Sequence, residues 1–182
     1  MRKQTTEQLL ILSRAMTPAA RQMLETMPKP MRVCGRRLPA NLNDLTLGEL
    51  FRLQSAGGDR ELIETVAEVL LKVTPRRALR ENGMRMYGFV FWVGRELERI
   101  AGMFAAINTP PTGDEIRAGI RELDFGPFGI IDWYARRQGY ADQNEAANVA
   151  WIRVYECMRI DNKRADYERR LREIMVEKYH RK

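Results

Sequence analysis

The sequence predicts an all-α protein: a single-domain helical bundle of about eight helices, with a long central helix and a long C-terminal helix. Apolar residues recur every three or four positions over most of the chain, which is the helical period. No strand-like alternation of any length interrupts this pattern, and capping motifs, prolines and glycines divide it into segments. With 182 residues, 45% of them hydrophobic, the chain can bury a core without metal or disulfide support.

Residues 1–44 are predicted to form one or two short helices followed by a basic, proline-rich arm. Thr17 and Pro18 make a good helix start, because Thr can cap free amides and Pro suits the first helical position. The helical pattern breaks over residues 27–44, where Pro and Gly recur. The stretch 31–38 also fits a short strand or hairpin. The breaking residues are Pro28, Pro30, Gly35 and Pro39.

The helical domain is predicted to span residues 45–182, with the C-terminal helix protruding from it. Its first helix begins with a capping box, in which Thr46 and Glu49 cap each other's backbone amides. Gly57 is expected to end that helix, and an amphipathic helix follows over about residues 60–73.

The central helix is predicted over about residues 84–107, where apolar residues are spaced in steps of three and four. Phe89 and Trp92 widen the apolar face, so the first half of this helix is expected to be buried on more than one side. The two prolines at 110–111 should end the run. The apolar positions are Met86, Val90, Val93, Leu97, Ile100, Phe104 and Ile107.

The C-terminal part continues with a second capping box, formed by Thr112 and Glu115. Pro127 is a suitable first residue for another helix, and Gly139 is a suitable end. The last helix is predicted over about residues 148–179; it is apolar in its first half and mostly charged in its second.

The bulk composition limits the functional classes. A net charge of +7 favours acidic partners such as nucleic acid, an anionic membrane surface or an acidic protein. Two distant cysteines, Cys34 and Cys157, and a single histidine, His180, form neither a disulfide framework nor a zinc motif. No signal peptide or span of about 20 apolar residues is visible. These features predict a cytoplasmic protein without a membrane partner.

The sequence offers weak material for catalysis, and we expect a protein that is not an enzyme and has no metal or cofactor. Asp124 and Asp132 lie on either side of an apolar segment and could form an acid/base pair in a pocket. The simpler interpretation is that one of them caps a helix and the other is salt-bridged. Cys157 lies on an apolar helix face, where an inert thiol is the usual case. No phosphate-binding glycine loop is present.

Two surfaces are candidates for binding a partner. Tyr167, Leu171 and Ile174 form a thin apolar seam on the last helix, with little local chain to pack against. A partner subunit, or the N-terminal helices, should cover them. Most aromatic residues are instead expected in the core: Phe89, Trp92, Phe125, Phe128, Trp133, Tyr134, Trp151 and Tyr155.

The basic arm is the electrostatic candidate. Arg32, Arg36 and Arg37 have no acidic neighbours in the sequence, whereas most other arginines are interleaved with Glu or Asp. A nucleic acid is the ligand that such an arm would attract without reading its sequence.

Several segments of the chain resemble segments of a known class of proteins. LTLGEL at 45–50, followed by Leu53 and the helix at Asp59, resembles the opening motif of bacteriophage and prophage tail assembly chaperones and related tail-module proteins. Later segments are similar to small helical proteins of that genomic setting, so that the likeness covers roughly residues 41–174. These segments are FW at 91–92, FGPFG at 125–129, DWYARR at 132–137 and WIRVY at 151–155.

The resemblance implies a non-enzymatic assembly protein, and a phage-encoded protein would be located in the host bacterial cytoplasm. Such chaperones hold the apolar, helix-rich tape-measure protein while tail subunits polymerise around it, which requires apolar surface presented by helices. The implied partners are a helical tail or tape-measure protein and a second copy of the chain. Two alternatives remain open: a helical DNA- or RNA-binding module that uses the basic arm, and a structural or connector component of the virion.

Overall fold

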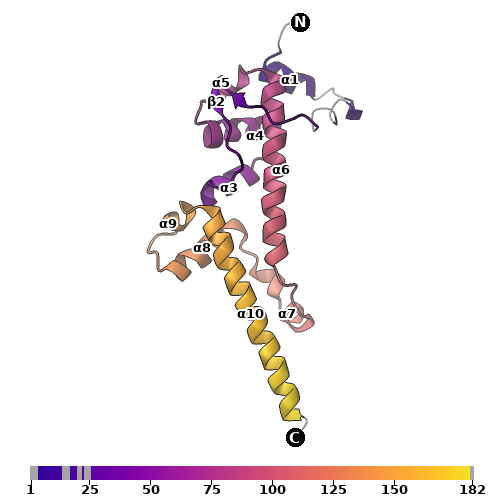
Figure 1. Cartoon of the computed structure of the whole chain (residues 1–182), viewed down its shortest axis with the longest axis vertical. Helices are drawn as coiled ribbons and strands as arrows, with labels where there is room; N and C mark the ends of the chain where they lie inside the picture. The colour runs from indigo at the N-terminus through magenta and orange to yellow at the C-terminus, as the bar shows by residue number, and fades with distance from the viewer. Residues whose placement is uncertain (1–3, 14–16, 20–21, 23–25, 181–182) are drawn as a thin grey trace. The chain divides into compact units, whose positions relative to one another are not determined.

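The computed structural model describes residues 4–13, 17–19, 22 and 26–180, and it confirms the all-α class. The one sheet among these residues is a hairpin of two short strands. The chain forms two compact units, Met1–Ile100 and Ala101–Lys182. Both long helices are present: the predicted central helix is α6 (Gly83–Ile107) and the C-terminal helix is α10 (Trp151–His180) (Figure 1).

The first unit consists of short helices and the beginning of α6. These helices are α1 (Thr6–Ser13), α3 (Leu47–Gln54), α4 (Asp59–Val66), the π-helical turn η1 (Ala67–Leu71) and α5 (Pro75–Leu79). The helix expected after Thr17 and Pro18 lies largely outside the described residues.

Local capping chemistry sets the helix boundaries in this unit. The predicted capping box before α3 is present: the Thr46 hydroxyl accepts from the Glu49 amide at 3.1 Å, and the Glu49 carboxylate accepts from the Thr46 amide at 3.1 Å. The amphipathic helix predicted over 60–73 changes to π geometry at Ala67 and ends at Lys72, which has a left-handed φ of 51°.

The first half of α6 is buried on more than one side, as predicted. Met86, Phe89 and Val93 are fully buried, and Trp92 is 8% exposed. The lack of a side chain at Gly83 lets the start of α6 pack closely against α1, because a Cβ at this position would lie 3.0 Å from Leu9 Cβ.

The proline-rich segment is an integral part of the first unit, so its description as an arm is wrong. Strands β1 (Arg32–Val33) and β2 (Arg36–Arg37) form the hairpin that the sequence left as an alternative. Both turn residues, Cys34 and Gly35, have positive φ (50° and 75°), as a two-residue type I′ turn requires. The segment also buries apolar side chains at four positions: Val33, Cys34, Leu38 and Leu42.

Further contacts attach this segment to α6. The Lys29 ammonium lies over the Trp92 ring, 3.6 Å from its centroid. The Leu42 amide donates to the Glu96 carboxylate at 3.2 Å, and Arg99 binds the same carboxylate at 2.9 Å. Residues 27–43 thus contribute to the core of the first unit. That residues 45–182 form a domain by themselves stays a prediction.

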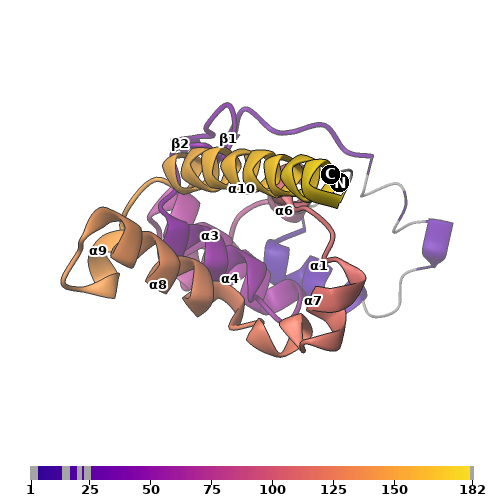
Figure 2. The ribbon, with the colours of Figure 1, turned by 90° about the horizontal axis from the view of Figure 1, so that it is seen from below.

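The second unit contains the end of α6 and five later elements. They are α7 (Gly113–Arg117), the 3-10 turn η2 (Ile120–Leu123), α8 (Gly126–Gln138), α9 (Gln143–Ala147) and α10. The capping box at Thr112 and the C-terminal Gly139, with φ 73°, are confirmed. Figure 2 shows α8 and α9 side by side.

The core of the second unit is built around the first turns of α10. Trp151 and Val154 are fully buried, and Phe104 packs against Trp151 with ring centroids 6.0 Å apart. Arg137 of α8 forms an ion pair with Asp161 of α10 at 2.9 Å, and its hydrogen bonds lower the pKa of Asp161 below the ordinary range.

Candidate functional surfaces

One face of α10 carries its contacts within the second unit. Trp151 packs in the core, and the Asn162 amide group donates to the Ile107 carbonyl at 2.8 Å. One turn later, Asp166 accepts from the Thr109 hydroxyl at 3.0 Å. These contacts define the packed face of α10.

The predicted seam residues lie on another face of α10 and are solvent-exposed. Tyr167, Leu171 and Ile174 are 59%, 41% and 51% exposed, and Ile160 is 41% exposed. At about 100° per residue, the three seam residues lie about 120–180° round the helix from Asn162. We call Ile160, Tyr167, Leu171 and Ile174 the α10 seam.

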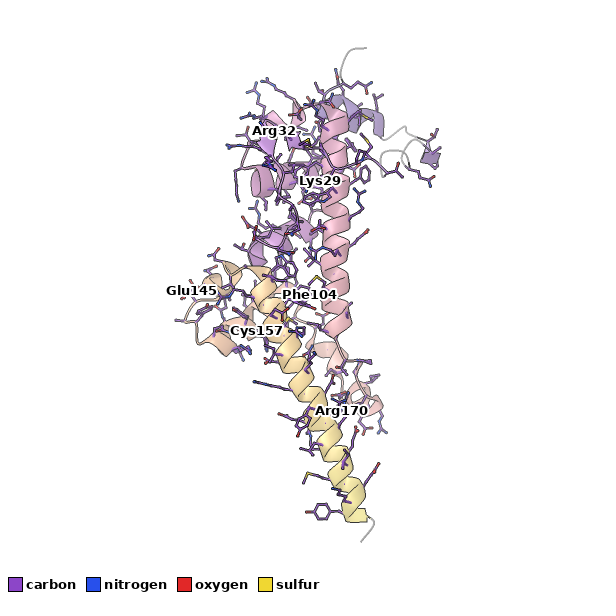
Figure 3. The ribbon with its side chains drawn as sticks, in the orientation of Figure 1. Lys29, Arg32, Phe104, Glu145, Cys157 and Arg170 are labelled. Atoms are coloured by element: carbon purple, nitrogen blue, oxygen red, sulfur yellow. The ribbon has the colours of Figure 1, made fainter. Side chains whose placement is uncertain are left out.

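The α10 seam has the spacing of a coiled-coil edge. Steps of four and three residues lead from Ile160 through Arg164, Tyr167, Leu171 and Ile174, which is a heptad pattern interrupted by one charged residue, Arg164. Charges of both signs flank it, as expected at positions beside a helix–helix contact. The flanking residues are Lys163, Glu168, Arg170 and Glu177, and Figure 3 labels Arg170 on the exposed part of α10.

A second apolar surface, over residues 116–128, was not predicted. Phe125 and Phe128 are 66% and 60% exposed, so the expectation that they belong to the core is wrong. Phe125 and Phe128 lie at the start of α8, where the positive φ of Gly126 (56°) turns the chain sharply. The element before α8 is only a 3-10 turn, Ile120–Leu123, which leaves both rings uncovered. An open groove of about 620 Å³ lies here, lined by Leu123, Phe125, Trp133 and Met158 among others. Repeated large apolar residues between glycines were the only signal in the sequence.

The predicted electrostatic residues are all exposed on the hairpin. Arg32 and Arg37 lie directly opposite each other in the strand register, and Arg36 is opposite Val33. Figure 3 labels Arg32 in this segment.

The fold adds α5 to this basic hairpin. The Arg77 guanidinium donates to the Cys34 carbonyl at the hairpin turn, at 3.0 Å, and the Cys34 amide donates to the Glu81 carboxylate at 2.6 Å. Two basic stretches some 40 residues apart in sequence thereby become neighbours. We call the exposed arginines of both stretches the arginine face: Arg32, Arg36, Arg37, Arg76, Arg77 and Arg80.

The groups considered for catalysis have structural contacts. The Asp124 carboxylate accepts from the Gly126 amide at 2.9 Å at the start of α8, and Asp132 is paired with Arg136 at 2.9 Å. The half-buried Cys157 thiol accepts from the Gln138 side-chain amide at 4.0 Å. Cys34, which was not considered for catalysis, is buried, and its burial, with the nearby Glu81 carboxylate, raises the pKa of its thiol to about 11. Among the residues that the structure describes, no three metal-binding side chains cluster.

Comparisons with known proteins found no matching family model, no matching curated protein and no matching solved structure. Within the described ranges, no helix combines the length and the apolar character needed to cross a membrane.

Proposed function

We propose that this protein is a non-enzymatic assembly factor that binds an amphipathic helix of a partner protein along the α10 seam. The observation that carries the proposal is the exposure of Tyr167, Leu171 and Ile174 on a face of α10 other than its packed face. An apolar heptad edge flanked by charges is complementary to the apolar face of another helix, and covering it removes apolar surface from water.

The resemblance of residues 41–174 to phage tail assembly chaperones suggests the class of partner. Tape-measure proteins are long, helix-rich and apolar, so their amphipathic segments fit a helical seam. A tail assembly chaperone is therefore the function we propose, and pairing of two copies through the same seam would use the same physical chemistry. Mass spectrometry of purified particles separates this role from that of a virion component, because a chaperone should be missing from them.

The test uses the full chain and fluorescent peptides of about 28 residues, four heptads long, that cover the apolar heptads of a phage tape-measure protein. Wild-type protein should bind at least one peptide, as measured by fluorescence anisotropy. Ile174→Asp should weaken binding by tenfold or more, since it places a charge in the contact, a loss of about 1.4 kcal/mol or more.

Val176→Asp is the matched control. Val176 is 54% exposed, close to the 51% of Ile174, but it lies about 160° away round the helix. This variant has the same helix-propensity cost and should bind like wild type. Equal weakening by both variants would contradict the proposal, as would a protein that ignores every peptide and stays monomeric in light scattering.

A further inference from the structure

We propose that the arginine face binds the phosphate backbone of nucleic acid, independently of the α10 seam. The sequence predicted three arginines on a basic, proline-rich arm, whereas the fold holds six on a hairpin and on residues 76–80, which hydrogen bonds join. None of the six forms an ion pair with a described carboxylate, although many other arginines do.

The Glu81 carboxylate, which binds the hairpin turn, does not neutralise this face through an ion pair. The two oxygens of Glu81 accept from backbone amides, those of Cys34 at 2.6 Å and Asn82 at 2.9 Å. The Arg77 guanidinium donates to the Cys34 carbonyl. The other five guanidinium groups have no hydrogen-bond partner among the described residues and can donate to a ligand.

The strand register also favours a bound anion. Arg32 and Arg37 are directly opposite each other, and like charges in such a cross-strand pair destabilise a hairpin. A phosphate near both guanidinium groups would convert this repulsion into attraction. The native state would therefore gain stability on binding a polyanion.

Nucleic acid fits this face better than a membrane or an acidic protein. All six cations are arginines, whose planar fork matches phosphate oxygens in a bidentate way that lysine cannot reproduce. Membrane-surface elements combine basic residues with a broad apolar face. On the hairpin, Met31 is the large exposed apolar residue, and it is 85% exposed.

The experiment measures binding of the full chain to a random DNA duplex of about 20 base pairs and to a single-stranded RNA of similar length, across a salt series. For five phosphate contacts, the slope of log affinity against log salt should be about −4.5 on duplex DNA. Arg32→Ala/Arg37→Ala and Arg76→Ala/Arg80→Ala should each reduce the slope by about 2 and the affinity by tenfold or more at about 0.1 M salt.

Arg52→Ala/Arg60→Ala is the matched control. It removes the same charge from the same unit, but these arginines are paired with Glu68 and Glu64. The control should keep the wild-type slope, and thermal melts should show that all three variants fold. Salt-dependent binding to either nucleic acid supports the proposal.

Three outcomes would overturn this inference. The first is no binding to either nucleic acid at about 20 mM salt, where such attraction is strongest. The second is an equal loss of slope in the control and the arginine-face variants. The third is sedimentation with phosphatidylserine vesicles without binding to nucleic acid, which would assign the face to membranes.

Discussion

At the residue scale, the hairpin depends on two consecutive residues with left-handed φ. Cys34 accepts this conformation while only 4% exposed, and Gly35 accepts it without a Cβ. The turn positions the Cys34 amide and carbonyl for the contacts with Glu81 and Arg77. A strained turn thus joins the two basic stretches of the arginine face.

Gly35→Ala should lower the free energy of unfolding by about 1–2 kcal/mol, because a Cβ in the left-handed region clashes with its own backbone. The nearest other atom, Arg77 Nη2, is 3.7 Å from the Cβ position, so the cost comes from the backbone. Urea unfolding measures the change. Gly94→Ala, in α6 with no atom within 4 Å, is the control and should be neutral or stabilising. A Gly35→Ala protein as stable as wild type would contradict this account of the turn.

At the element scale, one carboxylate connects the segment before α3 to α6. Hydrogen bonds from Arg99 lower the pKa of Glu96 below its ordinary value; burial opposes this, and the Leu42 amide adds to the lowering. A carboxyl whose pKa is lower in the folded state stabilises the fold above its unfolded pKa of about 4.3, and this contribution disappears as the pH falls through the folded pKa.

Glu96→Gln should therefore lower the free energy of unfolding by about 1–2 kcal/mol at neutral pH, since hydrogen bonds to a charged group are lost. The difference from wild type should begin to shrink as the pH falls below the unfolded pKa of about 4.3, and it should vanish once the pH is below the lowered pKa of folded Glu96. Denaturant unfolding at several pH values measures this. Glu98→Gln, on an exposed neighbour, should match wild type at each pH. A difference independent of pH would rule out the ionised carboxylate as its cause.

Element boundaries were predictable where local chemistry decides them. Thr46 and Thr112 cap helices, and Gly139 ends one, because each acts on backbone groups within a few residues. That Tyr167, Leu171 and Ile174 share one face of α10 was also predictable, because a helical period determines which residues lie on the same face.

Features that depend on contacts distant in sequence were not predictable from spacing. Burial of the proline-rich segment against α6, and the joining of α5 to the hairpin, arise from pairs more than 40 residues apart. Phe125 and Phe128 were misassigned because apolar composition does not say whether a covering element exists.

At the scale of the whole molecule, the two proposed surfaces belong to different units. The arginine face lies within Met1–Ile100 and the α10 seam within Ala101–Lys182. The variants should therefore act separately: Ile174→Asp should leave nucleic-acid affinity unchanged, and the arginine variants should leave peptide affinity unchanged. Such independence would suit an assembly factor that holds a protein partner with one unit and a nucleic acid with the other.

The central claim is that a partner helix covers the α10 seam. Amide hydrogen exchange of the full chain, with and without the tape-measure peptide that binds most tightly, tests this most directly. We predict that exchange slows over residues 163–179 when the peptide is bound, since a covered helix opens less often. Slowing confined to residues 116–128, around the exposed Phe125 and Phe128, or no slowing anywhere, would contradict the claim.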